Sequence, residues 1–290
     1  MISRTRLGGF KVLKDVVQYA STLADSPAGL LKDLCRRLAE NKLNLPFFAC
    51  CRWNRAWEFT LAFHKEDARQ AGELLTGQLG TSGGAMEEGF ILSLFPHRYD
   101  PGVMGSLLRL LAEERIQPDA LANSSSAISV GFRQGSLEHV TKALFSRFRF
   151  SAYRTPEDWR LSQEGKEQLY KEVVASYQEK RPKVYALEWQ GGQILYRIRL
   201  DRETMEPASR IFKVLAQAKS PLTFLVTIAL GEEGPSHLCF CHPQRGDAKV
   251  LQMMGDFPNE AWGPKAEPVA HFAMNGPHFG DRYGIVSELL

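Results

Sequence analysis

Three short segments of the chain share a pattern of residues that could bind a small anionic ligand. They are Asp25-Ser26-Pro27-Ala28-Gly29-Leu30, Asp100-Pro101-Gly102-Val103 and Asp281-Arg282-Tyr283-Gly284-Ile285. Each begins with an Asp that can cap a helix and reaches a Gly followed by an aliphatic residue. The N–H groups and positive dipole at a helix N-terminus suit a carboxylate, and Gly allows a ligand to approach closely. The pattern therefore predicts three turns that bind a carboxylate-bearing small molecule.

The same turns also have a plainer interpretation. An Asp-Ser-Pro or Asp-Pro-Gly turn is an ordinary helix cap, which stabilises a helix by about 1 kcal/mol without any ligand. A further turn, Asp201-Arg202-Glu203-Thr204-Met205, keeps the Asp but lacks the Gly, which weakens the case for a ligand there. Ligand binding and simple capping therefore both remain open for each turn.

The strands and helices expected around the turns occur in the same order in two successive copies. In the first copy we expect a strand near 16–19, a helix to residue 40, strands over 45–53 and 57–63, and a helix over 66–75. In the second we expect strands over 90–95, 119–123 and 127–132, helices over 103–113 and 136–148, and a closing strand near 150–153. This strand–helix–strand–strand–helix order is typical of the split βαβ sandwich. The predicted fold class is α+β, with tandem ferredoxin-like βαββαβ modules and antiparallel sheets.

The second half of the chain repeats the order less regularly. We expect a hairpin of strands 184–189 and 194–200 joined at Gly191-Gly192, a helix over 206–218, strands over 222–230 and 237–241, and a helix over 248–254. The predicted organisation is modules over 10–83 and 84–155, a linker helix over 156–182, a divergent module over 183–260 and a partial module over 261–290. A half-module cannot bury both faces of its sheet. The last segment therefore belongs to a longer protein, or completes another module or a partner chain.

Composition restricts the class of protein. The 290 residues are 44% hydrophobic and 24% charged, with a net charge of +3, as in a soluble globular protein. The longest apolar run, 221–230, falls short of the roughly 20 residues that a membrane helix needs. Five cysteines, an odd number, argue against a disulfide scaffold. We expect a cytoplasmic protein that binds neither membranes nor nucleic acid.

Other groups of residues give weaker signals. His237, Cys239 and Cys241 would share one face of a strand, but their spacing is not that of a structural zinc site, and Cys50 and Cys51 would point apart. Arg147-Phe148-Arg149-Phe150 fits a helix end followed by a half-buried strand better than a nucleic-acid surface. The sequence has no phosphate-binding loop and no nucleophile with an adjacent base. We therefore expect no metal, no cofactor and no catalytic residues.

The motifs as a set resemble the ACT domain family of regulatory modules. The family pattern of a strand, Asp-x-Pro-Gly-aliphatic, a helix and Asn-aliphatic matches Asp25 to Leu30 with Asn44-Leu45, and it matches Asp100 to Val103 and Asp281 to Ile285. The segment from Asn123 to Val130 looks like the strand–turn–strand of an aspartokinase regulatory ACT pair. The resemblance covers residues 10–153 well and 183–290 loosely, and the chain lacks a kinase phosphate loop.

The resemblance implies an amino-acid effector held at the interface between modules, largely by backbone groups of the turns. It nominates as ligand-binding residues Asp25, Ser26, Pro27, Ala28, Gly29, Leu30, Asp100, Gly102, Val103, Ser124, Ser125, Asp281, Arg282, Gly284 and Ile285. It further implies a non-catalytic regulatory protein that forms a homodimer or binds another protein. The alternative function is a structural or oligomerisation module that binds no ligand.

Overall fold

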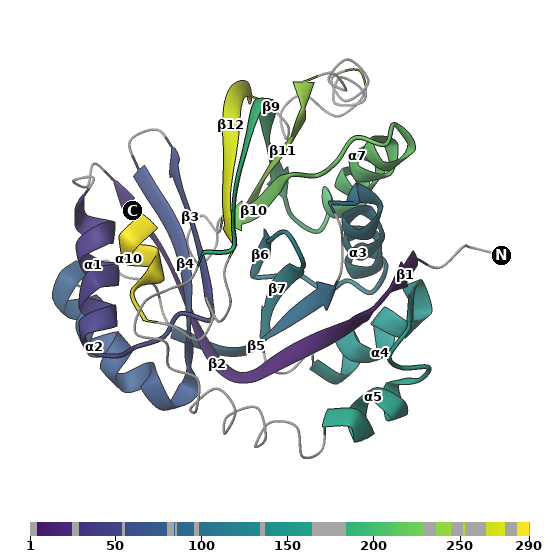
Figure 1. Ribbon diagram of the computed structural model, residues 1–290. Helices are drawn as coiled ribbons and strands as arrows, with labels where there is room; N and C mark the ends of the chain where they lie inside the picture. The colour runs from purple at the N-terminus through teal and green to yellow at the C-terminus, as the bar shows by residue number, and fades with distance from the viewer. Residues whose placement is uncertain are drawn as a thin grey trace.

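The computed structural model describes residues 5–24, 29–53, 56–79, 84, 86–95, 99–133, 137–163, 184–228, 236–244, 252, 265–275 and 283–289. Within these ranges the strands form one ten-stranded sheet, in the order β12-β9-β11-β10-β6-β7-β5-β2-β4-β3, and a separate parallel pair (Figure 1). Every pairing in the large sheet is antiparallel. The predicted α+β fold class with antiparallel sheets is confirmed.

The first group of elements has the predicted order. It comprises β2 (Gly9–Ala24), α1 (Gly29–Glu40), β3 (Phe47–Trp53), β4 (Ala56–His64), a 3₁₀ turn (Lys65–Asp67), α2 (Ala68–Leu79) and β5 (Met86–Phe95). Its strands lie in the order β5-β2-β4-β3. The strands and helices expected over residues 16–75 therefore lie close to their predicted positions.

The second group follows directly and shares β5 with the first. It comprises α3 (Pro101–Glu113), β6 (Ala120–Asn123), β7 (Ile128–Arg133), α4 (Leu137–Arg147), β8 (Phe148–Phe150) and α5 (Pro156–Gln163). Strand β5 pairs with β2 on one side and with β7 on the other. The closing strand β8 pairs in parallel with β1 (Thr5–Leu7), outside the large sheet. One strand thus serves two groups of elements.

The third group contains a long strand where a hairpin was expected. It comprises β9 (Ala186–Leu200), α7 (Met205–Gln217), β10 (Phe224–Ile228), β11 (Ser236–Pro243) and β12 (Lys265–Asn275), with α10 (Ile285–Leu289) after it. The predicted hairpin at Gly191-Gly192 is wrong, because β9 runs through both glycines and β12 pairs with it on either side. The predicted helix over 248–254 and the linker beyond residue 163 lie almost entirely outside the described residues. The division of the chain into modules remains a prediction.

The two long strand pairs, β2 with β5 and β9 with β12, carry the same irregularity. In β2, Lys14 and Asp15 lie between Leu13 and Val16, which pair with Ile91 and Gly89. In β9, Gly191 and Gly192 lie between Gln190 and Gln193, which pair with His271 and Val269. Asp15 and Gly192 both have positive φ, at 53° and 63°. The two glycines therefore form a β-bulge, which bends a strand without ending it.

The first helix of each group ends in the same cap. The helices α1, α3 and α7 each end in two nested backbone hydrogen bonds. The outer bond of each pair runs from Leu43 N–H to Leu38 O, from Ile116 N–H to Leu111 O, and from Ser220 N–H to Leu215 O. This is the Schellman motif. The residue with positive φ in each cap is basic, namely Lys42, Arg115 or Lys219. The first helix of all three groups thus ends in the same way.

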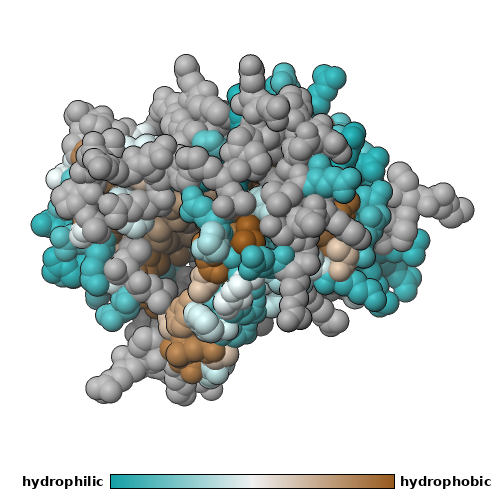
Figure 2. Space-filling view, turned by 90° about the horizontal axis from the view of Figure 1, so that it is seen from above, coloured by the Kyte–Doolittle hydropathy of each residue, from teal (hydrophilic) through white to brown (hydrophobic). Residues whose placement is uncertain are grey.

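The sheet bends along β2 and β5, so that its two halves face each other with the helices outside (Figure 1). One core lies under α3, α4, α5 and α7, and a second lies under α1 and α2. A third fills the space between the inner faces, where Phe47 and Ala49 of β3 belong to the same cluster as Val226 and Cys239. Seen from above, much of the described surface is hydrophilic, and hydrophobic residues gather on one projecting lobe and in the hollow beside it (Figure 2).

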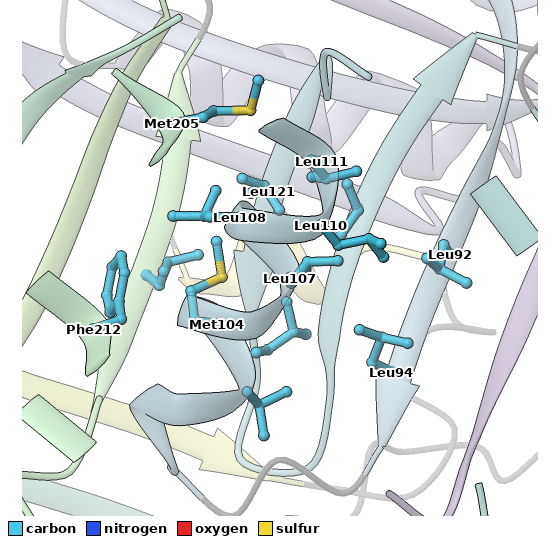
Figure 3. Close-up of a cluster of buried hydrophobic side chains, with 14 of the residues drawn as sticks. Leu92, Leu94, Met104, Leu107, Leu108, Leu110, Leu111, Leu121, Met205 and Phe212 are labelled. Carbon is cyan, nitrogen blue, oxygen red and sulfur yellow. The ribbon is translucent and has the colours of Figure 1, made fainter. Parts of the chain in front are cut away.

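The helices α3 and α7 pack side by side (Figure 1). Met104 and Leu108 of α3 lie toward Phe212 of α7 in the shared core (Figure 3). A β-carbon on Gly105 would lie 3.0 Å from Ser209 O and 3.2 Å from Phe212 Cβ. The two backbones can therefore approach this closely only because residue 105 has no side chain.

We predict that Gly105→Leu destabilises the protein by about 1–3 kcal/mol, because the side chain must push the two helices apart. Gly77→Leu is the matched control, since Gly77 is exposed on α2 and nothing lies within 4 Å of its β-carbon position. This control should be neutral or stabilising by up to about 1 kcal/mol, from helix propensity alone. Urea unfolding of both variants measures the effect, and equal stability of the two would contradict the proposed role of Gly105.

Candidate functional site

The second and third groups of elements join edge to edge around a pseudo-twofold axis. Strand β6 pairs with β10 through Ala122 and Val226. These two residues lie at the same distance along the chain from the caps that end α3 and α7 at Ile116 and Ser220. The two groups therefore meet through the same strand and the same helix of each, as in a symmetric pair.

Two reciprocal hydrogen bonds flank this strand pair. Leu121 N–H donates to Thr227 Oγ1 at 2.6 Å, and Leu225 N–H donates to Asn123 Oδ1 at 2.6 Å. Asn123 and Thr227 occupy equivalent positions in β6 and β10. Each side chain thus satisfies a backbone donor of the other strand, which would be costly to leave buried without an acceptor. These bonds fix the register of the two groups.

The Asp100 turn lies at this interface. Asp100 Oδ1 accepts a hydrogen bond from Gly102 N–H at 2.8 Å, and Val103 N–H donates to Asp100 O at 3.2 Å. Pro101 has no N–H group. The β-carbon position of Gly102 is 3.4 Å from Ala216 Cβ, near the end of α7. Asp100 is therefore an N-cap that is placed where the two groups meet.

A polar side chain of β9 and a backbone N–H group of the loop after α7 bond to Tyr99, which directly precedes Asp100. Leu222 N–H donates to Tyr99 O at 2.8 Å, and Tyr99 Oη donates to Glu188 Oε2 at 3.3 Å. Burial raises the pKa of Tyr99, and the Glu188 carboxylate raises it further. Carboxylates such as those of Asp100 and Glu188 suit an ammonium group, and the N-terminus of α3 suits a carboxylate. This end of the sheet thus has groups of both kinds that an α-amino acid needs.

The serine turn between β6 and β7 lies at the same end of the sheet. Leu94 at the end of β5 pairs with Ile128 at the start of β7, directly after this turn. Ser124 Oγ accepts hydrogen bonds from Ala127 N–H at 3.1 Å and from Ser126 N–H at 3.3 Å. Ser124 and Ser125 therefore lie on the side of the sheet where Asp100 begins α3, and Ser124 holds the turn together.

The remaining predicted site residues divide between two places. Val103 is 1% exposed in the core under α3, so its side chain faces away from any ligand at the turn. Gly29 and Leu30 begin α1, while Gly284 (φ +83°) and Ile285 begin α10, which packs beside α1 as α3 packs beside α7. Asp25, Ser26, Pro27, Ala28, Asp281 and Arg282 lie outside the described residues.

The turn that lacks Gly is a well-formed cap. Asp201 Oδ1 accepts hydrogen bonds from Glu203 N–H at 3.0 Å and from Thr204 N–H at 2.9 Å, and Arg199 forms an ion pair with its other oxygen at 2.6 Å. These bonds, with Arg199, lower the pKa of Asp201, although burial opposes them. The Asp201 carboxylate is therefore fully engaged within the protein.

A cluster that the sequence did not predict lies between the two inner sheet faces. Cys51 of β3 and Cys239 of β11 belong to the same core and hydrogen-bond through their thiols. Arg197 Nη2 donates to Cys51 Sγ at 3.2 Å. Glu58 is 3% exposed and pairs with Cys51 across β3 and β4. No sequence signal could bring these residues together, because their strands come from opposite halves of the chain.

The environment of the two thiols separates their pKa values. The hydrogen bond from Cys239, and secondarily the positive charge of Arg197, lowers the pKa of Cys51 to about 7, although burial and Glu58 oppose this. The same bond, together with burial, raises the pKa of Cys239. Burial raises the pKa of Cys50 to about 11, and those of Cys35 and Cys241 to about 12. Cys51 is therefore the thiol best suited to ionise at neutral pH.

Within the described ranges, no group of three or more His, Cys, Asp or Glu side chains is placed to hold a metal ion. In the same part of the chain, no helix is both long and apolar enough to cross a membrane. Cys50 and Cys51 point to opposite faces of β3, as expected. Cys50 packs against the core under α1 and α2, and Cys51 packs against the core between the inner sheet faces. The geometry at the Asp100 turn is that of a helix N-cap.

Comparison with known proteins gives a match in structure only. No protein-family model matches the chain, and no curated protein matches it. The aspartate kinase of Synechocystis matches with a TM-score of 0.72 over 97% of this chain and 48% of that one, at 14% identity. The regulatory subunit of aspartate kinase from Thermus thermophilus, in a ligand-free form, matches with a TM-score of 0.45 over 49% of this chain and 99% of that one, at 17% identity. The chain thus spans about half the length of the Synechocystis enzyme, and the expected resemblance is confirmed at the level of the fold.

We predict that iodoacetamide labels Cys51 with a half-maximal rate near pH 7, well below the pH that the other four cysteines require. Arg197→Gln should move this midpoint to higher pH, because the thiolate loses a positive charge and a hydrogen bond. Arg199→Gln is the control, since Arg199 lies on the same strand and forms its ion pair with Asp201 instead. Peptide mass spectrometry after timed labelling gives the rates, and an unchanged midpoint in Arg197→Gln would contradict the assignment.

Proposed function

We propose that this protein is a non-catalytic regulatory protein that binds an amino acid or a similar small acid at the interface of its ferredoxin-like units. The observation that carries the proposal is the position of the Asp100 turn. It begins α3 where the second and third groups meet, and Ala216 of α7 lies against Gly102. Sites between units are well suited to regulation, because a ligand there acts on how the units pack.

The chemistry of the turn supports an α-amino acid as the ligand. The effector carboxylate would lie at the N-terminus of α3, where backbone N–H groups and the helix dipole favour an anion. The effector ammonium group would lie by the carboxylate of Asp100 or of Glu188. Asp25 to Leu30 and Asp281 to Ile285 would supply two further sites, at the starts of α1 and α10, and Gly284 lies against Ala39 near the end of α1 as Gly102 lies against Ala216 near the end of α7. The fold that this chain shares with an aspartate kinase, an enzyme of amino-acid metabolism by its name, agrees with such an effector.

One observation favours a second function, a structural module without a ligand. The N–H groups at the start of α3 are already used, because Gly102 N–H bonds to the Asp100 carboxylate and Val103 N–H bonds to Asp100 O. An effector carboxylate would have to exchange with the Asp100 side chain. In this alternative the turns are caps, and the units serve only to assemble with each other or with a partner in the cytoplasm.

A thermal-shift screen of the twenty amino acids tests the proposal. An effector at about 100 times its dissociation constant adds roughly 2.7 kcal/mol to the stability of the folded state, which raises the melting temperature by several degrees. We predict a selective rise with one amino acid or a small group of related acids. No rise with any compound would favour the module without a ligand.

Two substitutions at Asp100 separate binding from capping. Ser is also a good N-cap, so Asp100→Ser should leave the melting temperature of the unliganded protein nearly unchanged but lose the shift with the effector. Asp100→Ala should lower the stability by about 1 kcal/mol and lose the shift as well. If Asp100→Ser responds to the effector as the unmodified protein does, Asp100 is a cap only.

A further inference from the structure

One part of the sheet exposes a continuous apolar surface. Residues 186–190 of β9 pair with residues 271–275 of β12, and we call this two-stranded extension the arm. On its outer face, Trp189 lies opposite Phe272 and Leu187 lies opposite Met274. Trp189 is 71% exposed, Leu187 62% and Phe272 57%. Large apolar side chains that gather in one exposed patch usually mark a binding surface.

The equivalent face of the other strand pair is fully covered. The bulges at Gly191-Gly192 and at Lys14-Asp15 align β9 with β2 and β12 with β5. With this alignment, the four outer residues of the arm correspond to four core residues, namely Phe10, Val12, Leu92 and Leu94. These four pair across their strands in the same way and are at most 7% exposed.

Helices cover that equivalent face. Phe10 stacks on Trp159 of α5, with ring centroids 4.9 Å apart, and meets Phe145 of α4 edge to face at 6.0 Å. Leu92 and Leu94 lie toward α3 (Figure 3). The same four positions are thus apolar in both strand pairs, yet within the described ranges helices cover only the pair of β2 and β5. The residue types of the arm are those of a buried face.

We propose that the outer face of the arm is an interface with a second copy of this chain, in which the two arms pack face to face across a twofold axis. The proposal does not depend on a ligand at the Asp100 turn. Sheet faces already pack on each other inside this molecule, where β3 and β4 meet β10 and β11. The dimer would use the same kind of contact on the outside.

The distribution of exposed apolar residues argues for a second copy as the partner. Among the described residues, the large hydrophobic side chains that are exposed are Phe95, Leu161, Val184, Tyr185, Leu187, Trp189, Phe272 and Tyr283. Most of them belong to the arm or to the two residues before it. Among the described residues, the arm is thus the surface of a second copy that best matches an apolar arm.

Charge and position also suit a twofold contact. In such a contact each charge near the axis meets its own copy, which is unfavourable. None of Leu187, Trp189, Phe272 and Met274 is charged, whereas Glu188, on the opposite face, bonds to Tyr99. This bond holds the inner face of the arm against Tyr99. On the same face, the rings of Phe224 and His271 lie together, with centroids 6.3 Å apart. Strand β12 is also the end of the ten-stranded sheet, so a second copy can approach it.

The available area is of the right size for a dimer. A buried aromatic side chain contributes roughly 150–250 Å². Trp189, Phe272 and the neighbouring Tyr185, together with Leu187 and Met274, would supply the greater part of the roughly 800 Å² per partner that a standard interface buries.

Sedimentation velocity of the full chain over a range of concentrations tests the proposal. We expect a concentration-dependent dimer, and we expect Leu187→Lys/Trp189→Lys to weaken it at least tenfold or to give a monomer. Both side chains are exposed in one copy, so the double variant should keep the circular dichroism spectrum and melting behaviour of a folded monomer. Leu161→Lys is the matched control, because Leu161 is 61% exposed on α5, away from the arm, and should leave the dimer unchanged.

A second measurement reports on the twofold geometry. Phe272→Cys should form a disulfide between two copies when a mild disulfide oxidant is added, and reducing agent should reverse it. Three results would overturn the proposal: a monomer at every concentration, a dimer that Leu187→Lys/Trp189→Lys leaves intact, or equal weakening by Leu161→Lys. A dimer that forms without crosslinking at residue 272 would also place the interface elsewhere.

Discussion

Gly105 allows the backbone of α3 to come so near α7 that a β-carbon at this position would touch the Ser209 carbonyl oxygen. The strands below the helices can pair only at this separation, because β6 and β10 must come within hydrogen-bonding distance at Ala122 and Val226. The side chains of Asn123 and Thr227 then each bind a backbone N–H group of the opposite strand. The close helix crossing and the strand pairing thus depend on each other, and together they place the Asp100 turn between two units.

The bulges in β2 and β9 have an equally general effect. A bulge bends its strand and increases the local twist. In β2 the bulge lets one strand contribute side chains to two cores. Phe10 and Val12, before the bulge, lie in the core under α4 and α5, and Val17 and Tyr19, after it, lie in the core under α1 and α2. The bend also brings the inner faces of the two halves together, which buries Cys239 against β3. A ten-stranded sheet without such a bend could not cover its own inner face.

The sequence was sufficient to predict most helices and strands, but not how the strands pair with one another. The apolar spacing of α1 and α3 and the Asp-Pro-Gly start of α3 predicted both helices, because the period of 3.6 residues and the cap agree. Gly191-Gly192 between two apolar segments is a strong hairpin signal, yet the same dipeptide suits a bulge, and only pairing with β12 decides between them. Lys42, Arg115 and Lys219 gave no signal at all, since a basic residue rarely ends a helix in the left-handed conformation. The candidate site was predicted in part: Asp100 and Gly102 lie at the interface, whereas Val103 belongs to the core.

The same geometry limits what an effector could change. A ligand shifts an equilibrium only by its difference in affinity for the two states. The contact between α3 and α7 is packed around a continuous core, and the side chains of Asn123 and Thr227 satisfy buried donors of the strand pair β6 and β10. An effector at the Asp100 turn therefore has little assembly left to drive at that interface. It would act by exchanging with the Asp100 carboxylate at Gly102 N–H, and so by moving Tyr99, whose hydroxyl holds Glu188 and with it the inner face of β9. Under the proposed function, the hydrogen bond from Tyr99 to Glu188 would connect the turn to β9, which lies next to the edge strand of the sheet.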